Sequence, residues 1–92
     1  MIANFRCPDT EALFYGRRIA RFINISAGAM RKLAILNRAA TLDDLRIPPG
    51  NRLEKLLGDR KGQYSIRIND QWRVCFYFED GRAFDVEIVD YH

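Results

Sequence analysis

The last three residues of the sequence, Asp90, Tyr91 and His92, carry the side chains that proton transfer requires. They supply a carboxylate, a phenol and an imidazole, and an imidazole titrates near neutral pH. His92 is the only histidine, so the sequence offers no histidine cluster for a metal ion. On this pattern alone, the three residues form either part of a proton-transfer site or an inert tail.

Two arginines are predicted to face each other across neighbouring strands. Apolar residues at even positions predict strands over residues 63–68, 72–78 and 82–89. Directly opposed residues must then sum to an even number, and a three-residue loop after the first strand places Arg67 opposite Arg73. Like charges in this register lower stability, so the pair either has a function or lies on a merely solvated face.

The same parity rule predicts the register of the following hairpin. A two-residue turn would break the rule, whereas a three-residue loop at 79–81 satisfies it. This loop places Phe76 opposite Phe84 and Arg73 opposite Glu87. Glu87 is therefore expected to offset part of the repulsion between the two arginines.

The polar face of this sheet brings the two unusual features together. Tyr91 has the parity of Arg73, so it is predicted to project from the same face as the arginine pair. An exposed face of an antiparallel sheet is normally polar, which keeps the functionless alternative open. Within the strands, the predicted polar face consists of Arg67, Arg73, Tyr77, Asp85 and Glu87.

Two helices are predicted before this sheet. Asp9 caps a short helix over residues 9–15, and Ser26 starts a longer helix over residues 27–40. Between them, residues 17–25 form either a helix end or a loop. Four residues of the longer helix are spaced for one buried stripe: Met30, Leu33, Leu36 and Ala40.

The chain turns to β-structure after a helix-breaking segment. Thr41 is expected to cap a last helical turn, and the proline- and glycine-containing run at 47–51 ends it. A strand over residues 52–57 and a loop at 58–62 then lead into the three strands described above. With a further strand at residues 1–7, the predicted fold is α+β, an antiparallel sheet with two N-terminal helices packed on one face.

Length and composition indicate a single domain spanning residues 1–92. The chain is 48% hydrophobic and 12% aromatic, which suffices for one core and not for two. Its two cysteines, Cys7 and Cys75, are too few for a secreted domain of this size, and Cys75 is expected to be a buried thiol. No membrane span or signal pattern is visible, so a cytoplasmic location is expected.

The positive charge is dominated by arginine. Twelve of the fifteen basic residues are Arg, whose planar guanidinium suits phosphate and stacks on bases. A stretch without acidic residues contains six of them: Arg17, Arg18, Arg21, Arg31, Lys32 and Arg38. This patch indicates either direct RNA contact or a solvated face that also serves protein docking or solubility.

The second half of the sequence contains several short elements at characteristic spacings: Gly58-Asp59-Arg60, Gly62, Tyr64-Ser65-Ile66, Trp72-Arg73 and the closing Asp90-Tyr91-His92. With these elements, residues 56–92 resemble the C-terminal half of HigB-type toxins in the RelE superfamily. The resemblance is less specific in the N-terminal half, which shares only the layout with Met1, Ile2 and Phe5.

The resemblance implies a metal-independent endoribonuclease without cofactors that cleaves translated mRNA in the ribosomal A site. A 2′-hydroxyl attacks the adjacent phosphate, so that a 2′,3′-cyclic phosphate and a 5′-hydroxyl remain. It also implies a helix-turn-helix, HigA-like antitoxin as protein partner. Arg73 then stabilises the phosphate charge, and Asp90, Tyr91 and His92 transfer protons and orient the substrate. Four further residues are expected to hold the RNA backbone: Lys55, Arg60, Lys61 and Arg67.

Two positions depart from the family pattern. Glu54 and Leu57 stand where well-known members have a second-strand His and a Lys. Glu54 can act as a base, but Lys55 replaces the missing lysine imperfectly because neighbouring residues in a strand point to opposite faces. We therefore predict a slower, milder toxin. The alternative is a protein of the same fold that binds the ribosome or the antitoxin without cleaving, and a purely structural domain is a third possibility.

Overall fold

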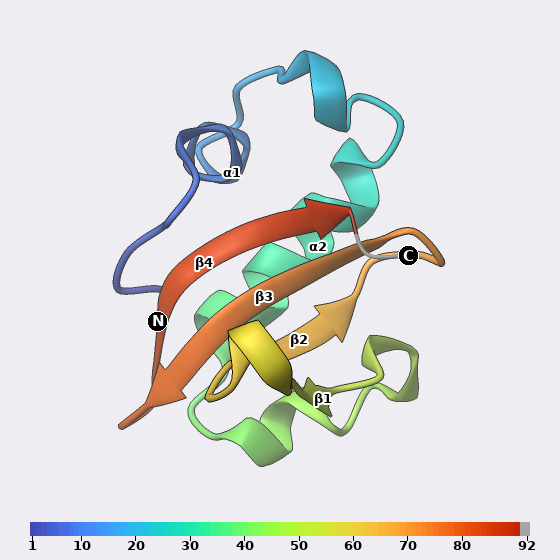
Figure 1. Ribbon diagram of the computed structural model, residues 1–92. Helices are drawn as coiled ribbons and strands as arrows, with labels where there is room; N and C mark the ends of the chain where they lie inside the picture. The colour runs from blue at the N-terminus through green and yellow to red at the C-terminus, as the bar shows by residue number, and fades with distance from the viewer. Residues whose placement is uncertain (91–92) are drawn as a thin grey trace.

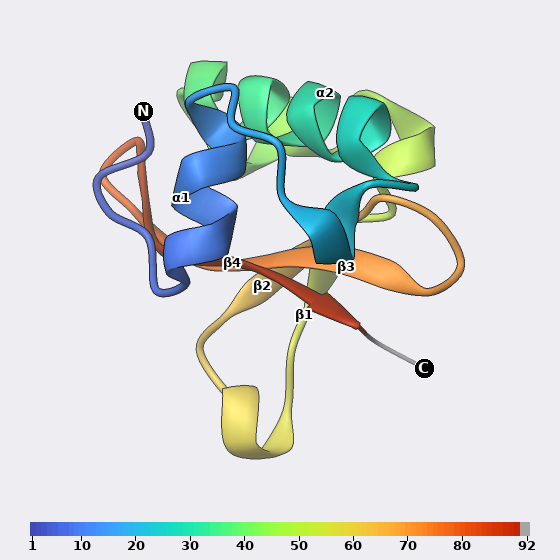
Figure 2. The same cartoon turned by 90° about the horizontal axis from the view of Figure 1, so that it is seen from above.

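The computed structural model describes residues 1–90, which form a four-stranded antiparallel sheet with helices on one of its faces (Figures 1 and 2). The strands are β1 (Glu54–Lys55), β2 (Tyr64–Arg67), β3 (Trp72–Glu79) and β4 (Arg82–Asp90), in that spatial order. This arrangement confirms the predicted α+β fold with helices on one face.

The helices are α1 (Pro8–Phe14), α2 (Ser26–Arg38) and four short 3-10 helices, the last of which lies in the loop between β1 and β2. The segment that was ambiguous in the sequence contains the 3-10 helix η1 (Ala20–Phe22). Asp9 does not cap α1, since Cys7 holds the N-cap position and the Asp9 carboxylate pairs with Arg21 at 3.0 Å. The remaining 3-10 helices are η2 (Leu42–Leu45), η3 (Pro49–Asn51) and η4 (Gly58–Arg60).

The predicted turn after α2 is present as η2. Thr41 and Asp44 form a reciprocal capping box, in which each side chain accepts a hydrogen bond from the other residue's backbone N–H. The predicted buried stripe of α2 is wrong at both of its ends. Met30 and Ala40 are exposed, and the stripe instead follows Ile25, Ala29, Leu33 and Leu36.

The N-terminal segment lies beside β4 but does not form the strand predicted over residues 1–7. Two isolated parallel bridges join Ile2 to Ala83 and Phe5 to Val86. Between them, the Asn4 side chain accepts a hydrogen bond from the backbone N–H of Asp85 at 2.9 Å and donates one to its carboxylate at 2.8 Å. Because a side chain occupies the middle of this pairing, a continuous backbone ladder does not form.

The hairpin between β2 and β3 has the predicted register. Arg67 pairs with Arg73 and Ile66 with Val74, and the backbone N–H of Ile68 donates to the carbonyl of Trp72 at 2.9 Å. The loop therefore contains three residues, 69–71. The strand predicted over residues 52–57 is too long. Arg52 adopts a left-handed conformation (φ 44°), and β1 spans only Glu54–Lys55.

The predicted register of the β3–β4 hairpin is wrong. Glu79 pairs with Arg82, so the turn contains only Asp80 and Gly81, both with positive φ, as in the tight turns that Asp-Gly favours. A β-bulge then places two residues of β4, Asp85 and Val86, opposite the single residue between Cys75 and Tyr77. The short turn and the bulge together shift the far half of the strand pair by two residues.

This shift changes both of the predicted pairs. Arg73 lies opposite Val89, and Glu87 lies opposite Cys75 instead of Arg73. Phe84 lies opposite Tyr77 and not opposite Phe76. Between the turn and the bulge, the buried residue of β4 is therefore Ala83, which lies opposite Phe78. The bulge returns the even positions of β4 to the core beyond it, where Val86 and Ile88 are buried as expected.

Cys75, which pairs with Ser65 and Glu87 in the sheet, is buried on the same face as Arg73, and its burial can be tested by titration. It is a free cysteine without exposed surface, and burial raises the pKa of its thiol to about 11 from a usual value of 9.0. The folded protein thus keeps a proton that the unfolded chain releases above pH 9, so stability falls as the pH rises. We expect a loss on the order of 2 kcal/mol between about pH 9 and about pH 11.

Urea unfolding of the wild type and Cys75→Ala across this pH range measures the effect. Substitution removes only the thiol titration, whereas the tyrosine and lysine titrations remain in both proteins. The wild type should lose stability more steeply than the variant above pH 9. Parallel pH dependences in the two proteins would show that burial does not raise the pKa of the Cys75 thiol.

Candidate active site around Arg73

Arg73 is the best-positioned of the predicted site residues. Its side chain is only 9% exposed and lies on the sheet face opposite the core, where β2 and β3 meet. The Nε group donates a hydrogen bond to the Ser65 hydroxyl at 2.7 Å, and Nη2 donates to the carbonyl of Arg52 at 2.6 Å. These bonds fix the guanidinium in one orientation, so little freedom remains to be lost when it binds an anion.

The two anchors of Arg73 come from different parts of the chain. Ser65 is buried on β2, diagonally across from Arg73 on the same face. Arg52 presents its carbonyl because the chain turns into the left-handed region at the end of η3. An arginine held by two such hydrogen bonds presents its remaining N–H groups in a defined direction.

A cavity of about 220 Å³ opens beside the guanidinium. Glu54 of β1 reaches it from one side, with its Oε1 atom 3.5 Å from the Nη1 atom of Arg73, and remains 54% exposed. Arg67 reaches it from β2 and forms an ion pair with Asp70. The lining residues are Arg52, Glu54, Arg67, Asn69, Asp70 and Arg73.

The charges around this cavity are partly balanced. Glu54 pairs with Arg73, and Asp70 pairs with Arg67. These two carboxylates offset the repulsion between the arginines, a role that we predicted for Glu87. Nearby, burial together with the charges of Arg31 and Arg67 lowers the pKa of Lys32. A site with two guanidinium groups and a carboxylate can hold a phosphodiester and accept a proton beside it.

The closing residues of the sequence are only partly described. Asp90 pairs with Trp72, whose ring packs against Phe22, so Asp90 lies on the helix side of the sheet and not on the face of Arg73. Its carboxylate accepts a hydrogen bond from the Gln71 side chain at 3.1 Å. The structure therefore does not bring Asp90 and Arg73 together, and Tyr91 and His92 lie outside the described residues.

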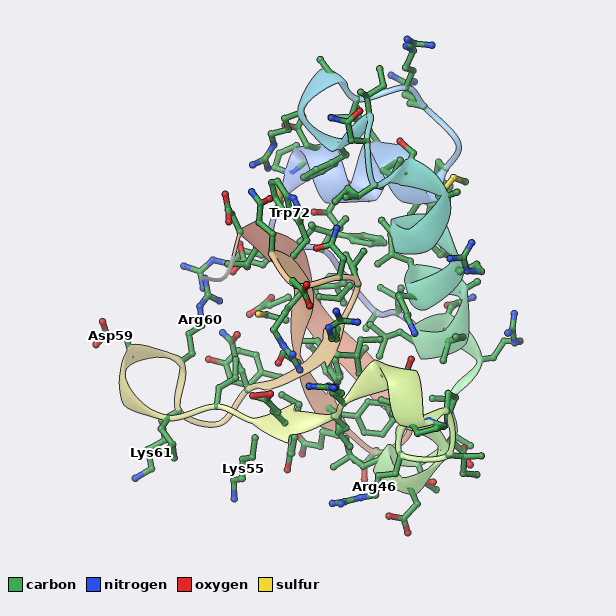
Figure 3. The ribbon with its side chains drawn as sticks, turned by 90° about the vertical axis from the view of Figure 1, so that its right-hand side faces the viewer. Arg46, Lys55, Asp59, Arg60, Lys61 and Trp72 are labelled. Atoms are coloured by element: carbon green, nitrogen blue, oxygen red, sulfur yellow. The ribbon has the colours of Figure 1, made fainter. Side chains whose placement is uncertain are left out.

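Of the other basic residues predicted to bind RNA, Lys55 lies on β1, and Arg60 and Lys61 lie in the loop between β1 and β2. This loop projects from the sheet on the side away from the helices (Figure 2). Figure 3 shows the Lys55 and Lys61 side chains on the same side of this loop, pointing away from Arg60. The Nη1 atom of Arg60 instead donates to Gln63 at 3.1 Å and to Glu87 at 2.8 Å, and thereby ties the loop to β4.

Four residues that line or support the cavity were not predicted to belong to the site: Arg52, Ser65, Asn69 and Asp70. Ser65 has the same parity as Arg67 and Arg73, so the alternation along β2 contained a signal for it. Arg52 acts through its backbone carbonyl, for which the side-chain pattern contains no signal. Asn69 and Asp70 lie in the loop between β2 and β3, which the register predicted without assigning its side chains a role.

Two general findings concern residues 1–90. No group of three His, Cys, Asp or Glu side chains in this range is arranged to hold a metal ion. None of the helices in the described part of the chain is long and apolar enough to cross a membrane.

Comparison with known proteins identifies the family. Residues 14–92 match the model of a family described as RelE-like toxin of type II toxin–antitoxin system HigB. Toxin HigB-1 of Vibrio cholerae serotype O1 is 52% identical over 60 residues, which cover 65% of this chain and 63% of that protein. Endoribonuclease HigB of Proteus vulgaris is 42% identical over 41 residues, which cover 45% of each. The matched part therefore spans less than two thirds of either relative. The match over residues 14–92 nevertheless shows that the chain belongs to the HigB family of RelE-like toxins.

Proposed function

We propose that this chain is the toxin of a type II toxin–antitoxin system and acts as an endoribonuclease on mRNA in the ribosomal A site. The observation that supports this function best is the preorganised Arg73 guanidinium, held by Ser65 and Arg52 at the edge of an open cavity with Glu54. A relative from Proteus vulgaris is named an endoribonuclease, which agrees with this chemistry.

In the proposed reaction, an RNA 2′-hydroxyl attacks the adjacent phosphorus atom. Glu54 accepts the hydroxyl proton, and Arg73 stabilises the additional negative charge on the phosphate oxygens. The bond to the 5′-oxygen then breaks, and a proton supplied by Tyr91 or His92, the residues that follow Asp90, converts this oxygen to a 5′-hydroxyl. The products are a 2′,3′-cyclic phosphate and a 5′-hydroxyl, and no metal ion or cofactor takes part.

RNA binding is proposed to extend from the cavity along the β1–β2 loop. Arg67 borders the cavity, and Lys55 and Lys61 project from one side of the loop (Figure 3). Arg60, which lies in η4 of this loop and pairs with Glu87, is proposed to contribute as well. Because these contacts go to phosphates, affinity for RNA should fall as the salt concentration rises.

The proposed partners follow from the family. A type II toxin is paired with an antitoxin, here proposed to be a helix-turn-helix, HigA-like protein, and the proposed target is mRNA on the small ribosomal subunit. The proposed location is therefore the cytoplasm, where translation occurs.

The proposed dependence on ribosomes can be tested directly. The purified chain is incubated with one mRNA that is either free or engaged by translating ribosomes, and primer extension maps the cuts. We expect discrete cuts only in the translated mRNA. Equal cleavage of the free mRNA would contradict ribosome dependence without removing the nuclease activity.

A second candidate function is binding without cleavage. It is favoured by Leu57, which is 81% exposed at the position where well-known members carry a lysine, and by Glu54 in place of their histidine. We therefore also propose that cleavage is slower than in those members. If the wild type arrests ribosomes without cutting mRNA, this second function replaces the first.

Substitution of Glu54 tests its proposed role as base. We expect Glu54→Gln to lower the cleavage rate about tenfold or more while RNA affinity is retained, since the amide cannot accept the proton. Arg73 should stay in place because its bonds to Ser65 and Arg52 do not involve Glu54. Single-turnover cleavage on programmed ribosomes measures the rate.

Glu79→Gln is a suitable control because Glu79 is an exposed carboxylate at the far end of β3. This variant should cleave at the wild-type rate. Unchanged cleavage in Glu54→Gln would exclude Glu54 as the base and transfer that role to another residue.

A further inference from the structure

Residues of α1, of α2 and of the segment between them line a groove. Figure 2 shows the two helices on one side of the sheet, whereas the Arg73 side chain lies on the opposite face. The volume of the groove is about 340 Å³. The buried side chain of Leu13 lines it, together with Ile23 and Met30, which are 42% and 40% exposed. Large apolar side chains that border a hollow and remain exposed are typical of a docking site.

A second hollow of about 330 Å³ adjoins this groove at the end of α1. Tyr15, the most exposed aromatic residue described at 71%, lines it, and Glu11 contributes one carboxylate. Arg17 lines both hollows. The apolar surface thus continues across the end of α1.

The rim of the groove is positively charged. Arg17 and Arg18 line it, both are exposed, and neither forms an ion pair within residues 1–90. The sequence contains no acidic residue between Glu11 and Asp43, so no carboxylate of this segment can neutralise them. By contrast, Arg21 of the same segment pairs with Asp9.

The apolar groove and its positively charged rim together indicate which kind of partner binds there. Phosphates of RNA would satisfy the two arginines, but they cannot fill an apolar groove lined by Leu13, Ile23 and Met30. An amphipathic protein segment satisfies both features, since its apolar side chains fill the groove and its carboxylates pair with Arg17 and Arg18.

We infer that the groove between α1 and α2 docks a short, acidic, amphipathic segment of the cognate antitoxin. This inference rests on the proposed function in one respect, namely that the chain has an antitoxin partner. The apolar residues provide the buried contact, and the two arginines provide orientation and the rate of association.

The test measures binding of the full chain to the purified product of the reading frame beside its gene by titration calorimetry. Two variants alter the groove: Arg17→Glu/Arg18→Glu and Met30→Asp. Each is expected to weaken binding about tenfold or more. Higher salt should weaken wild-type binding more than binding of the double variant, which has lost the complementary charges.

Matched controls lie outside the groove. Arg38→Glu reverses a charge in the same acid-free segment, and Ile47→Asp places a carboxylate at a residue that is 75% exposed. Both controls should bind within about twofold of the wild type. Circular dichroism and thermal unfolding verify that all four variants are folded, which their exposed positions favour.

The outcomes separate the inference from the proposed function. If the wild type binds the neighbouring product and the groove variants bind equally well, the docking site is wrong while the antitoxin assignment stands. If the groove variants keep antitoxin affinity and instead lose ribosome affinity, the surface binds RNA and the inference is overturned. Absence of wild-type binding would overturn the antitoxin assignment and this inference together, although cleavage on ribosomes would still test the nuclease.

Discussion

Arg73→Ala should lower mRNA cleavage by roughly 100- to 1,000-fold, the usual effect of removing a preorganised group that stabilises developing charge. The Arg73 side chain is only 9% exposed, and its hydrogen bonds to Ser65 and Arg52 hold it in place before substrate arrives. None of the other cavity residues holds a guanidinium in this position. Single-turnover cleavage on programmed ribosomes is the appropriate measurement, because it separates the chemical step from product release.

Arg73→Lys distinguishes charge from geometry. A lysine keeps the positive charge, but its ammonium group cannot reproduce the planar fork that contacts Ser65, Arg52 and Glu54 at the same time. We expect this variant to lose at least about tenfold in rate. Thermal unfolding must accompany both variants, since loss of a buried partner of Ser65 lowers stability. A folded Arg73→Ala protein that cleaves at the wild-type rate would exclude the proposed site.

A chain that ends at Asp90 should lose roughly 100-fold or more of its cleavage rate, in the range that general acid–base groups contribute. The truncation removes Tyr91 and His92 and leaves all of β4 (Arg82–Asp90) in place. We therefore expect the truncated protein to fold and to bind its antitoxin normally. Any purification tag belongs at the N-terminus in these experiments, because a C-terminal extension would alter the tested residues.

Single substitutions show how much each of the three closing residues contributes to the cleavage rate. Tyr91→Phe removes only a hydroxyl, His92→Ala removes the imidazole, and Asp90→Asn keeps the shape of a side chain that bonds to Gln71. Since Asp90 lies on the helix side of the sheet, its substitution should have the smallest effect of the three. If the truncated chain cleaves as fast as the full chain, the closing residues have no catalytic role.

The sequence predicted the parts of the fold that depend on local alternation. Even-numbered apolar residues correctly placed Ile66 and Val74 in the core and Arg67 opposite Arg73, because one hairpin with a three-residue loop relates them. The second hairpin was wrong because the parity rule assumes an uninterrupted ladder. The turn is one residue shorter than predicted, and the bulge at Asp85 adds the residue that brings the even positions of β4 back to the core. The bulge is stabilised by Asn4, a residue 81 positions away.

The candidate site shows the same division. Arg67 and Arg73 were identified by strand parity and Glu54 through the family resemblance, and all three line one cavity. Ser65 shares their parity, so it could have been included. The Arg52 carbonyl could not have been predicted, because its position depends on a left-handed backbone conformation at the end of η3. No local sequence pattern indicates this conformation. Glu87 was assigned to Arg73 but pairs with Arg60, a consequence of the two-residue shift.

The chemical identity of the RNA ends tests the central claim most directly. The purified chain is added to ribosomes translating a defined mRNA, and the new 3′ ends are analysed for a 2′,3′-cyclic phosphate. We predict discrete cuts that carry this group, and their loss in Arg73→Ala. New ends with a free 3′-hydroxyl, or translation arrest without any cut, would contradict cleavage by 2′-hydroxyl attack at the Arg73 cavity.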